Sequence, residues 1–130
     1  MTNKEIVKGF FQKAYEEQDY DFVMEYFSKD YLDHSPAGAK SNKQAVEILK
    51  GAAKTFEQVK VEVLDLFEEN GLVGVRILFQ GIQVGEFAGV APTGKKITFE
   101  ALEHFKLVNG KVTESWGYWP DMEIVNKLNA

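Results

Sequence analysis

Apolar residues in the first half of the chain repeat at the spacing of α-helices. The first stripe has charged and amide side chains on its other side and consists of Ile6, Val7, Phe10, Phe11 and Ala14. A second, shorter stripe lies at residues 22–27, and Asp19 or Asp21 can cap its helix. Ser41 and Gln44 form a capping-box pattern that opens a third helix, which we expect to end near Thr55. The pattern predicts three helices before any long strand.

From Val59 onward the period of the apolar residues changes from helical to two, which is typical of strands. Turn signals at Asn70-Gly71 and Asn109-Gly110 separate this region into hairpins. We expect further strands at residues 72–80, 83–90, 96–108 and 111–119, followed by a short helix at residues 122–128. Helices followed by antiparallel strands predict an α+β domain, in which a curved, mostly antiparallel sheet wraps the helices and leaves a cavity at its open end.

The second hairpin allows side chains to be assigned to the two faces of the sheet. A two-residue turn places Val108 opposite Lys111, and regular pairing then continues along both strands. Two carboxylates, Glu103 and Glu114, fall on the apolar face, whereas His104 falls on the polar face with Thr113 and Ser115. The other residues on the apolar face are Ala101, Phe105, Leu107, Val112, Trp116 and Tyr118.

Composition limits the classes of function. The 130 residues are 45% hydrophobic and contain no cysteine, which predicts one domain over residues 1–130 and a cytoplasmic location. The net charge is −5 without a basic stripe, so we expect no nucleic-acid partner, and no apolar run is long enough to span a membrane. With two histidines at unsuitable spacing, neither a metal site nor another cofactor is expected.

The end of the last strand carries the candidate chemistry. Asp121 directly follows a strand that contains Trp116, Tyr118 and Trp119, where an apolar pocket would hold its acid. This arrangement predicts acid/base catalysis without a cofactor. A second interpretation is that Asp121 only caps the final helix.

Several separate motifs resemble one known family. They are Gly85-Glu86-Phe87, Pro92-Thr93-Gly94-Lys95, the segment from Gly110 to Trp116, and Asp121, with Asp33-His34-Ser35-Pro36 as an earlier histidine motif. Together they resemble the SnoaL-like polyketide cyclases, also called ester cyclases, of the nuclear-transport-factor-2-like superfamily. The resemblance covers nearly the whole chain and implies a cone-shaped α+β fold. It departs from the family in one place, because one extra residue lies between Trp116 and Asp121.

The resemblance implies an intramolecular aldol cyclisation or an isomerisation of a small apolar carbonyl compound. Asp121 would be the base and then the acid, with its pKa raised by apolar neighbours, and His34 would donate a hydrogen bond to the carbonyl. Asp33 and His34 are equally explained by a turn before Pro36. We expect the substrate to contact Trp116, Tyr118, Trp119, Phe87, Glu103 and Glu114, although both glutamates are also explained by pairing with lysines at the rim of the sheet.

Two other functions stay open from the sequence. One is an epoxide hydrolase or cofactor-free hydroxylase, in which the only arginine, Arg76, would orient the substrate. The other is a binding module that holds a small apolar ligand without turnover. We also expect a homodimer, because Leu102, Val108 and Trp119 interrupt an otherwise polar strand face.

Overall fold

The five strands of the domain form one sheet in the order β1-β5-β4-β3-β2. The computed structural model describes all residues from 1 to 130. The helical half consists of α1 (Asn3–Phe10), the π-helical segment η1 (Phe11–Glu16), α2 (Tyr20–Tyr26) and α3 (Asn42–Thr55), with strand β1 (Phe27–Asp33) between the last two. The second half contains β2 (Phe56–Glu69), β3 (Leu72–Gln83), β4 (Lys96–Val108), β5 (Lys111–Tyr118) and the final helix α4 (Asp121–Asn129).

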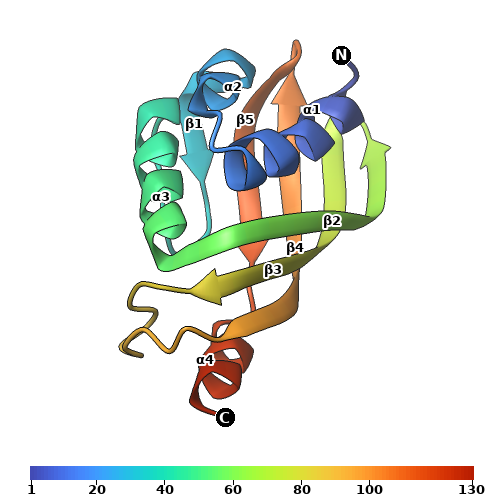
Figure 1. Cartoon of the computed structure of the whole chain (residues 1–130). Helices are drawn as coiled ribbons and strands as arrows, with labels where there is room; N and C mark the ends of the chain where they lie inside the picture. Colours follow the sequence, from blue (N-terminus) through green and yellow to red (C-terminus); the bar gives the residue numbers. More distant parts are fainter.

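The sheet curves around the helices and leaves its other face uncovered by helices (Figure 1). Strand β1 is parallel to β5, whereas all other neighbouring strands are antiparallel. The main apolar cluster joins α1, η1 and α3 to the inner face of the sheet. A smaller cluster at the far end attaches α4 and contains Phe56, Phe79, Ile97, Phe99, Ile124 and Leu128. The predicted α+β class and the cone shape are confirmed.

The third helix matches the prediction at both ends, whereas the first two helices end differently. The Ser41 hydroxyl accepts a hydrogen bond from the Gln44 N–H, and α3 ends at Thr55 as expected. The Gln44 side chain accepts from the Lys40 N–H, so the capping box is shifted by one residue. The first helix widens into a π-helix at Phe11, and Phe27 is the first residue of β1 rather than the last residue of a helix.

A β-bulge between β4 and β5 changes the faces predicted for the second hairpin. Leu107 pairs with Val112, but Lys106 pairs with Glu114, so Thr113 is an extra residue on β5. Beyond the bulge, Ser115 is inward and buried, because a one-residue shift exchanges the two faces of a strand.

The assignments of Glu114, Trp116 and Tyr118 to the inner face are therefore wrong, whereas the inward position of Glu103 is confirmed. The outward residues of β5 pair with outward residues of β4, namely Glu114 with Lys106, Trp116 with His104 and Tyr118 with Leu102.

The predicted strand at residues 83–90 is wrong, because β3 continues to Gln83 and a loop then spans residues 84–95. The buried Gln83 side chain supplies the hydrogen bonds that a neighbouring strand would otherwise make. Its amide nitrogen donates to the carbonyl oxygens of Gly85 and Val90, and its amide oxygen accepts from the N–H and the hydroxyl of Thr93. A Cβ atom on Gly85 would lie 2.4 Å from the Lys54 carbonyl oxygen, so this close approach requires glycine.

The final helix begins at Asp121, one residue earlier than predicted. Pro120 occupies the N-cap position, and no side chain caps the helix. The interpretation of Asp121 as the N-cap is therefore wrong. None of the helices has the length and apolar character needed to cross a membrane, and the cytoplasmic location stays a prediction.

Candidate functional site

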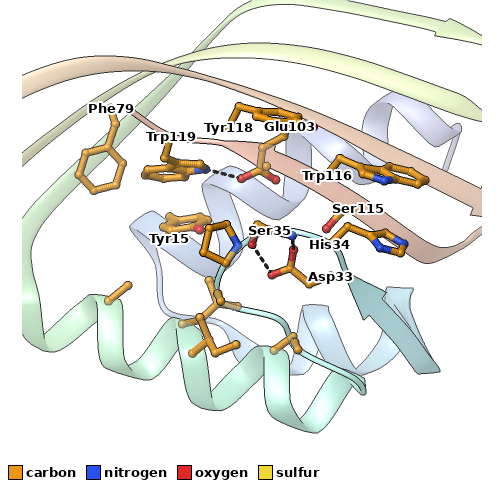
Figure 2. Close-up of a pocket in the computed structure, with 18 of the residues that line it drawn as sticks. Tyr15, Asp33, His34, Ser35, Phe79, Glu103, Ser115, Trp116, Tyr118 and Trp119 are labelled. Carbon is orange, nitrogen blue, oxygen red and sulfur yellow. Dashed lines mark hydrogen bonds between the residues drawn. The ribbon is translucent and has the colours of Figure 1, made fainter. Parts of the chain in front are cut away.

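A cavity of about 510 Å³ lies between the inner face of the sheet and the helices. It is lined by 28 residues, of which 19 are hydrophobic, so any ligand inside meets mainly aromatic and aliphatic carbon. Helix α3 contributes mainly apolar side chains, and the inner polar ones include Tyr15 of η1, Glu103 of β4 and Ser115 of β5 (Figure 2). The exposed lining residues mark the mouth and include His34, Pro36, Ala37, Tyr118 and Asp121.

Glu103 is the buried carboxylate of this cavity. Strand β4 alternates inward and outward residues along its whole length, which places Glu103 between the inward Ala101 and Phe105 with 9% of its surface exposed. Trp119 donates a hydrogen bond from Nε1 to Glu103 Oε1 at 2.6 Å (Figure 2). Glu103 Oε2 has no partner in the chain, and no fully enclosed side-chain oxygen lacks one, so Oε2 is open to the cavity.

Gly117 provides the space for this carboxylate. It lies opposite Glu103 in the β4–β5 pairing, and a Cβ atom there would be 3.3 Å from Glu103 Cδ and Oε1. This distance is shorter than an ordinary van der Waals contact. A larger residue at position 117 would therefore push the carboxyl group away from Trp119.

Burial raises the pKa of Glu103 to about 7, because the apolar surroundings disfavour the charged form. The hydrogen bond from Trp119 acts in the opposite direction and favours the carboxylate. The negative charge of Asp33 raises the pKa further. Glu103 is therefore a carboxyl group that exchanges a proton near neutral pH.

Tyr15 places a hydroxyl group in the same cavity. Its ring stacks on Trp119, with ring centroids 5.9 Å apart and an angle of 29° between the planes. Its hydroxyl makes no hydrogen bond within the chain, and burial, followed by the charge of Glu103, raises its pKa well above the usual value. Tyr15 belongs to η1, and π-helical turns occur frequently at functional sites.

The remaining inner polar groups come from β1 and β5. Tyr31 and Ser115, both buried, share a hydrogen bond of 2.5 Å between their hydroxyl oxygens. Asp33 accepts hydrogen bonds from the backbone N–H and the hydroxyl of Ser35, at 2.8 and 2.9 Å. These bonds form a turn at the end of β1, as one interpretation of the sequence predicted for this segment.

His34 lies at the mouth of the cavity, where its ring stacks on Trp116 at a centroid distance of 4.9 Å. Its Nε2 is 2.9 Å from Glu114 Oε2, which is outside the cavity lining. Glu114 also approaches Lys106, with 4.0 Å between Nζ and Oε1, as expected for a glutamate at the rim of the sheet.

Asp121 also lies at the mouth and is exposed, so the expectation of apolar surroundings for this carboxylate is wrong. The cause is the turn at Pro120, which starts α4 directly after Trp119. Among the other predicted contacts, Trp119 and Phe87 line the interior, while Trp116 and the largely exposed Tyr118 line the mouth.

The structure therefore divides the predicted site residues. It brings Glu103, Trp119 and Phe87 into one cavity, places Asp121 and His34 at its edge, and leaves Glu114 outside. Sequence reasoning missed Tyr15, Tyr31 and Ser115 as inner polar groups. A signal existed for Tyr15, which follows Phe11 by four residues in the first helical stripe.

Arg76 lies on the opposite face of the sheet from the cavity. It is paired with Asp65 and Glu100, at nitrogen to oxygen distances of 2.6 and 2.5 Å. Arg76 is therefore not placed to orient a substrate in this cavity. No group of three or more histidine, aspartate or glutamate side chains is arranged to hold a metal ion.

Comparison with known proteins identifies relatives of the chain. The profile of the SnoaL-like polyketide cyclases matches residues 5–128. The aklanonic acid methyl ester cyclase DnrD from Streptomyces peucetius is 31% identical over 101 residues, which are 75% of this chain and 67% of DnrD.

Solved structures share the whole fold. A protein of Jannaschia sp. CCS1 assigned as a SnoaL-like polyketide cyclase has a TM-score of 0.90 at 21% identity, with coverage of 98% of this chain and 92% of that one. AclR from Streptomyces galilaeus, described as a hydroxylase, has a TM-score of 0.84 at 26% identity, with coverage of 98% and 95%.

The raised pKa of Glu103 predicts a pH dependence of stability. The unfolded carboxyl group ionises near pH 4.5 and the folded one near pH 7, so between these values the unfolded chain releases a proton that the folded one retains. The contribution of Glu103 to the free energy of unfolding is therefore complete below pH 4.5. It falls by about 3 kcal/mol in total as the pH rises to 7. Urea unfolding between pH 4.5 and 8 measures this loss.

The variant Glu103→Gln is the control for this prediction, because it has the same shape without the titration. We expect the difference in unfolding free energy between the wild type and the variant to change across this pH range. Parallel pH curves for the two proteins would contradict the burial of an ionisable group at this position.

Proposed function

Because the chain belongs to the SnoaL-like polyketide cyclase family, we propose that it catalyses the cyclisation or isomerisation of a small apolar carbonyl compound. The reaction is an intramolecular aldol closure or a proton shift, and both need only proton transfer by the protein, without a cofactor. The observation that carries the proposal is the buried carboxyl group of Glu103, which has one oxygen open to an apolar cavity.

Glu103 Oε2 is the proposed base. It takes a proton from the carbon next to a carbonyl group, and the electron pair of the broken C–H bond forms an enolate. The enolate carbon attacks a second carbonyl of the same molecule, and the resulting alkoxide receives the proton back from Glu103. A pKa of about 7 suits both steps, because the group accepts and returns a proton near neutral pH.

Tyr15 is the proposed donor to the enolate oxygen. Its hydroxyl is free of partners within the chain and lines the same cavity as Glu103. A donor at the developing negative charge stabilises the transition state more than the ground state. We assign the mouth residues Asp121, His34, Trp116 and Tyr118 to the outer part of the substrate, and Trp119 and Phe87 to the inner part.

This assignment moves the acid/base role from Asp121 to Glu103. A base that works at neutral pH requires surroundings that disfavour its charge, and Glu103 has them, whereas Asp121 is exposed. The likeness to AclR supports a hydroxylase as a second candidate, but Arg76, the residue expected to orient its substrate, does not line the cavity. A binding module without turnover is the remaining alternative, and a turnover assay separates it from the proposed enzyme.

Exchange of the α-protons of 2-tetralone in deuterated buffer tests the proposal. The Glu103→Gln variant should exchange at least about 100-fold more slowly than the wild type, because a positioned base contributes roughly 10²–10⁴-fold. The wild-type rate should rise as the pH increases through about 7, since the base must be ionised. Proton NMR measures the exchange.

Asp121→Asn tests the other candidate base, and we expect it to exchange within about 3-fold of the wild type, because the exposed Asp121 is assigned to the outer part of the substrate and not to the reacting carbon. A large loss in this variant alone would return the catalytic role to Asp121. If the wild type binds 2-tetralone but does not exchange its protons, the protein is a binding module.

The Tyr15→Phe variant tests the donor. It keeps the ring that stacks on Trp119 and removes only the hydroxyl. We expect a fall in kcat for tetralone exchange of about 10-fold or more with little change in KM, because the hydrogen bond forms mainly with the enolate. An unchanged kcat would exclude Tyr15 as the donor.

We also propose a homodimer that uses the outer face of the sheet. Leu102, Val108 and Tyr118 are about half or more exposed on this face, and Leu102 and Tyr118 are direct neighbours across β4 and β5. Trp119, which we expected on this face, lies in the cavity instead. The exposed apolar side chains support an interface there.

Sedimentation measurements check the dimer. At micromolar concentration, we expect a species of twice the chain mass of 14.7 kDa. Leu102→Lys should shift the protein toward the monomer, because it places a charge in the apolar part of the interface. A wild-type protein that sediments as a monomer would overturn the proposal.

A further inference from the structure

The cavity has no positively charged anchor for a ligand. Of its 28 lining residues, Asp33, Glu103 and Asp121 carry carboxyl groups, His34 carries an imidazole, and none is a lysine or an arginine. Glu103 and Asp33 influence each other electrostatically, as the contribution of Asp33 to the raised pKa of Glu103 indicates. In Figure 2 both carboxyl groups lie among the labelled side chains of the cavity.

All of the lysines and the arginine lie outside the cavity lining, and several of them have partners elsewhere. Arg76 is on the outer face of the sheet between two carboxylates. Lys95 donates to carbonyl oxygens at the end of α4, and Lys111 donates to the Glu25 carbonyl oxygen. Lys127 donates to the Thr98 carbonyl oxygen and pairs with Glu123. None of these residues lines the cavity.

This arrangement distinguishes ligands by the sign of their charge. An anion that enters the cavity loses its water without gaining a counter-ion, and it approaches carboxylates at short range. A cation also loses water, but it gains the attraction of Glu103 and Asp33.

We propose that the cavity selects its ligand by charge: it takes an apolar compound that is uncharged or carries a protonated amine, and it rejects the corresponding carboxylate or phosphate. This inference rests on the proposed function only in taking this cavity as the binding site.

Three probes of nearly equal shape test the proposal at pH 8: methyl 2-naphthoate, 2-naphthoate and 2-naphthylmethylammonium. Binding is measured by isothermal titration calorimetry. We expect the neutral ester and the ammonium ion to bind with dissociation constants within about 5-fold of each other. The carboxylate should bind at least about 10-fold more weakly than both, because it alone is repelled by the cavity.

A pH series isolates the contribution of Glu103. The groups that face Glu103 are Asp33 and Tyr31 from β1 and Tyr15 from η1, while His34 and Asp121 lie at the mouth. Between pH 8 and pH 5.5 Glu103 becomes neutral, whereas 2-naphthoate stays an anion. Its affinity should therefore rise by about 3-fold or more in the wild type.

Two variants serve as controls for the pH series. Glu103→Gln should bind 2-naphthoate more tightly than the wild type at pH 8 and lose most of the pH dependence. Glu100→Gln removes a carboxylate on the outer face of the sheet and should leave both properties unchanged. A merely structural role of Glu103 would not make Glu103→Gln bind the anion more tightly with less pH dependence while Glu100→Gln leaves both properties unchanged.

Equal affinities for the ester and the carboxylate would overturn the inference. Equally weak binding of 2-naphthoate and 2-naphthylmethylammonium would also overturn it, because the cavity would then disfavour both charges through the cost of removing their water. These results concern binding alone and leave the proposed catalysis to the tetralone assay. If none of the three probes binds, the inference fails, whereas the proposed function is still decided by the tetralone assay.

Discussion

The burial of one carboxyl group beneath aromatic rings is the constraint on which the rest of the site depends. Glu103 keeps its position because Trp119 donates to one of its oxygens and Gly117 leaves room beside it. Trp119 is in turn held by Tyr15 from the helical layer and by Phe79 and Phe99 from the sheet. The hydrogen bond that orients Glu103 thus links both layers of the domain.

The interior and the mouth of the cavity have different physical character. Inside, the polar groups are few, buried and surrounded by aromatic carbon, so electrostatic interactions there are strong. At the mouth, His34 rests on Trp116 and is bonded to a partly exposed glutamate, where water weakens such interactions. This division fits a reaction at the inner end and recognition of the variable part of a substrate at the outer end.

Much of the fold could be predicted from the sequence because the local signals agree with one another. Asn109 and Gly110 both adopt the positive φ angles that their turn requires, and the strict alternation of β4 placed Glu103 inward. Features that depend on tertiary contacts could not be predicted. The loop after Gln83 replaces a strand because its hydrogen bonds come from a buried side chain, and the exposure of Asp121 follows from the turn at Pro120.

The extra residue Thr113 determines which side chains of β5 face the cavity. Downstream of it the small residues Ser115 and Gly117 face inward, and the bulky Glu114, Trp116 and Tyr118 face outward. Losing one residue here during evolution would turn the strand over and fill the cone with large side chains. A single inserted residue in β5 therefore decides whether the interior of the cone is hollow or filled.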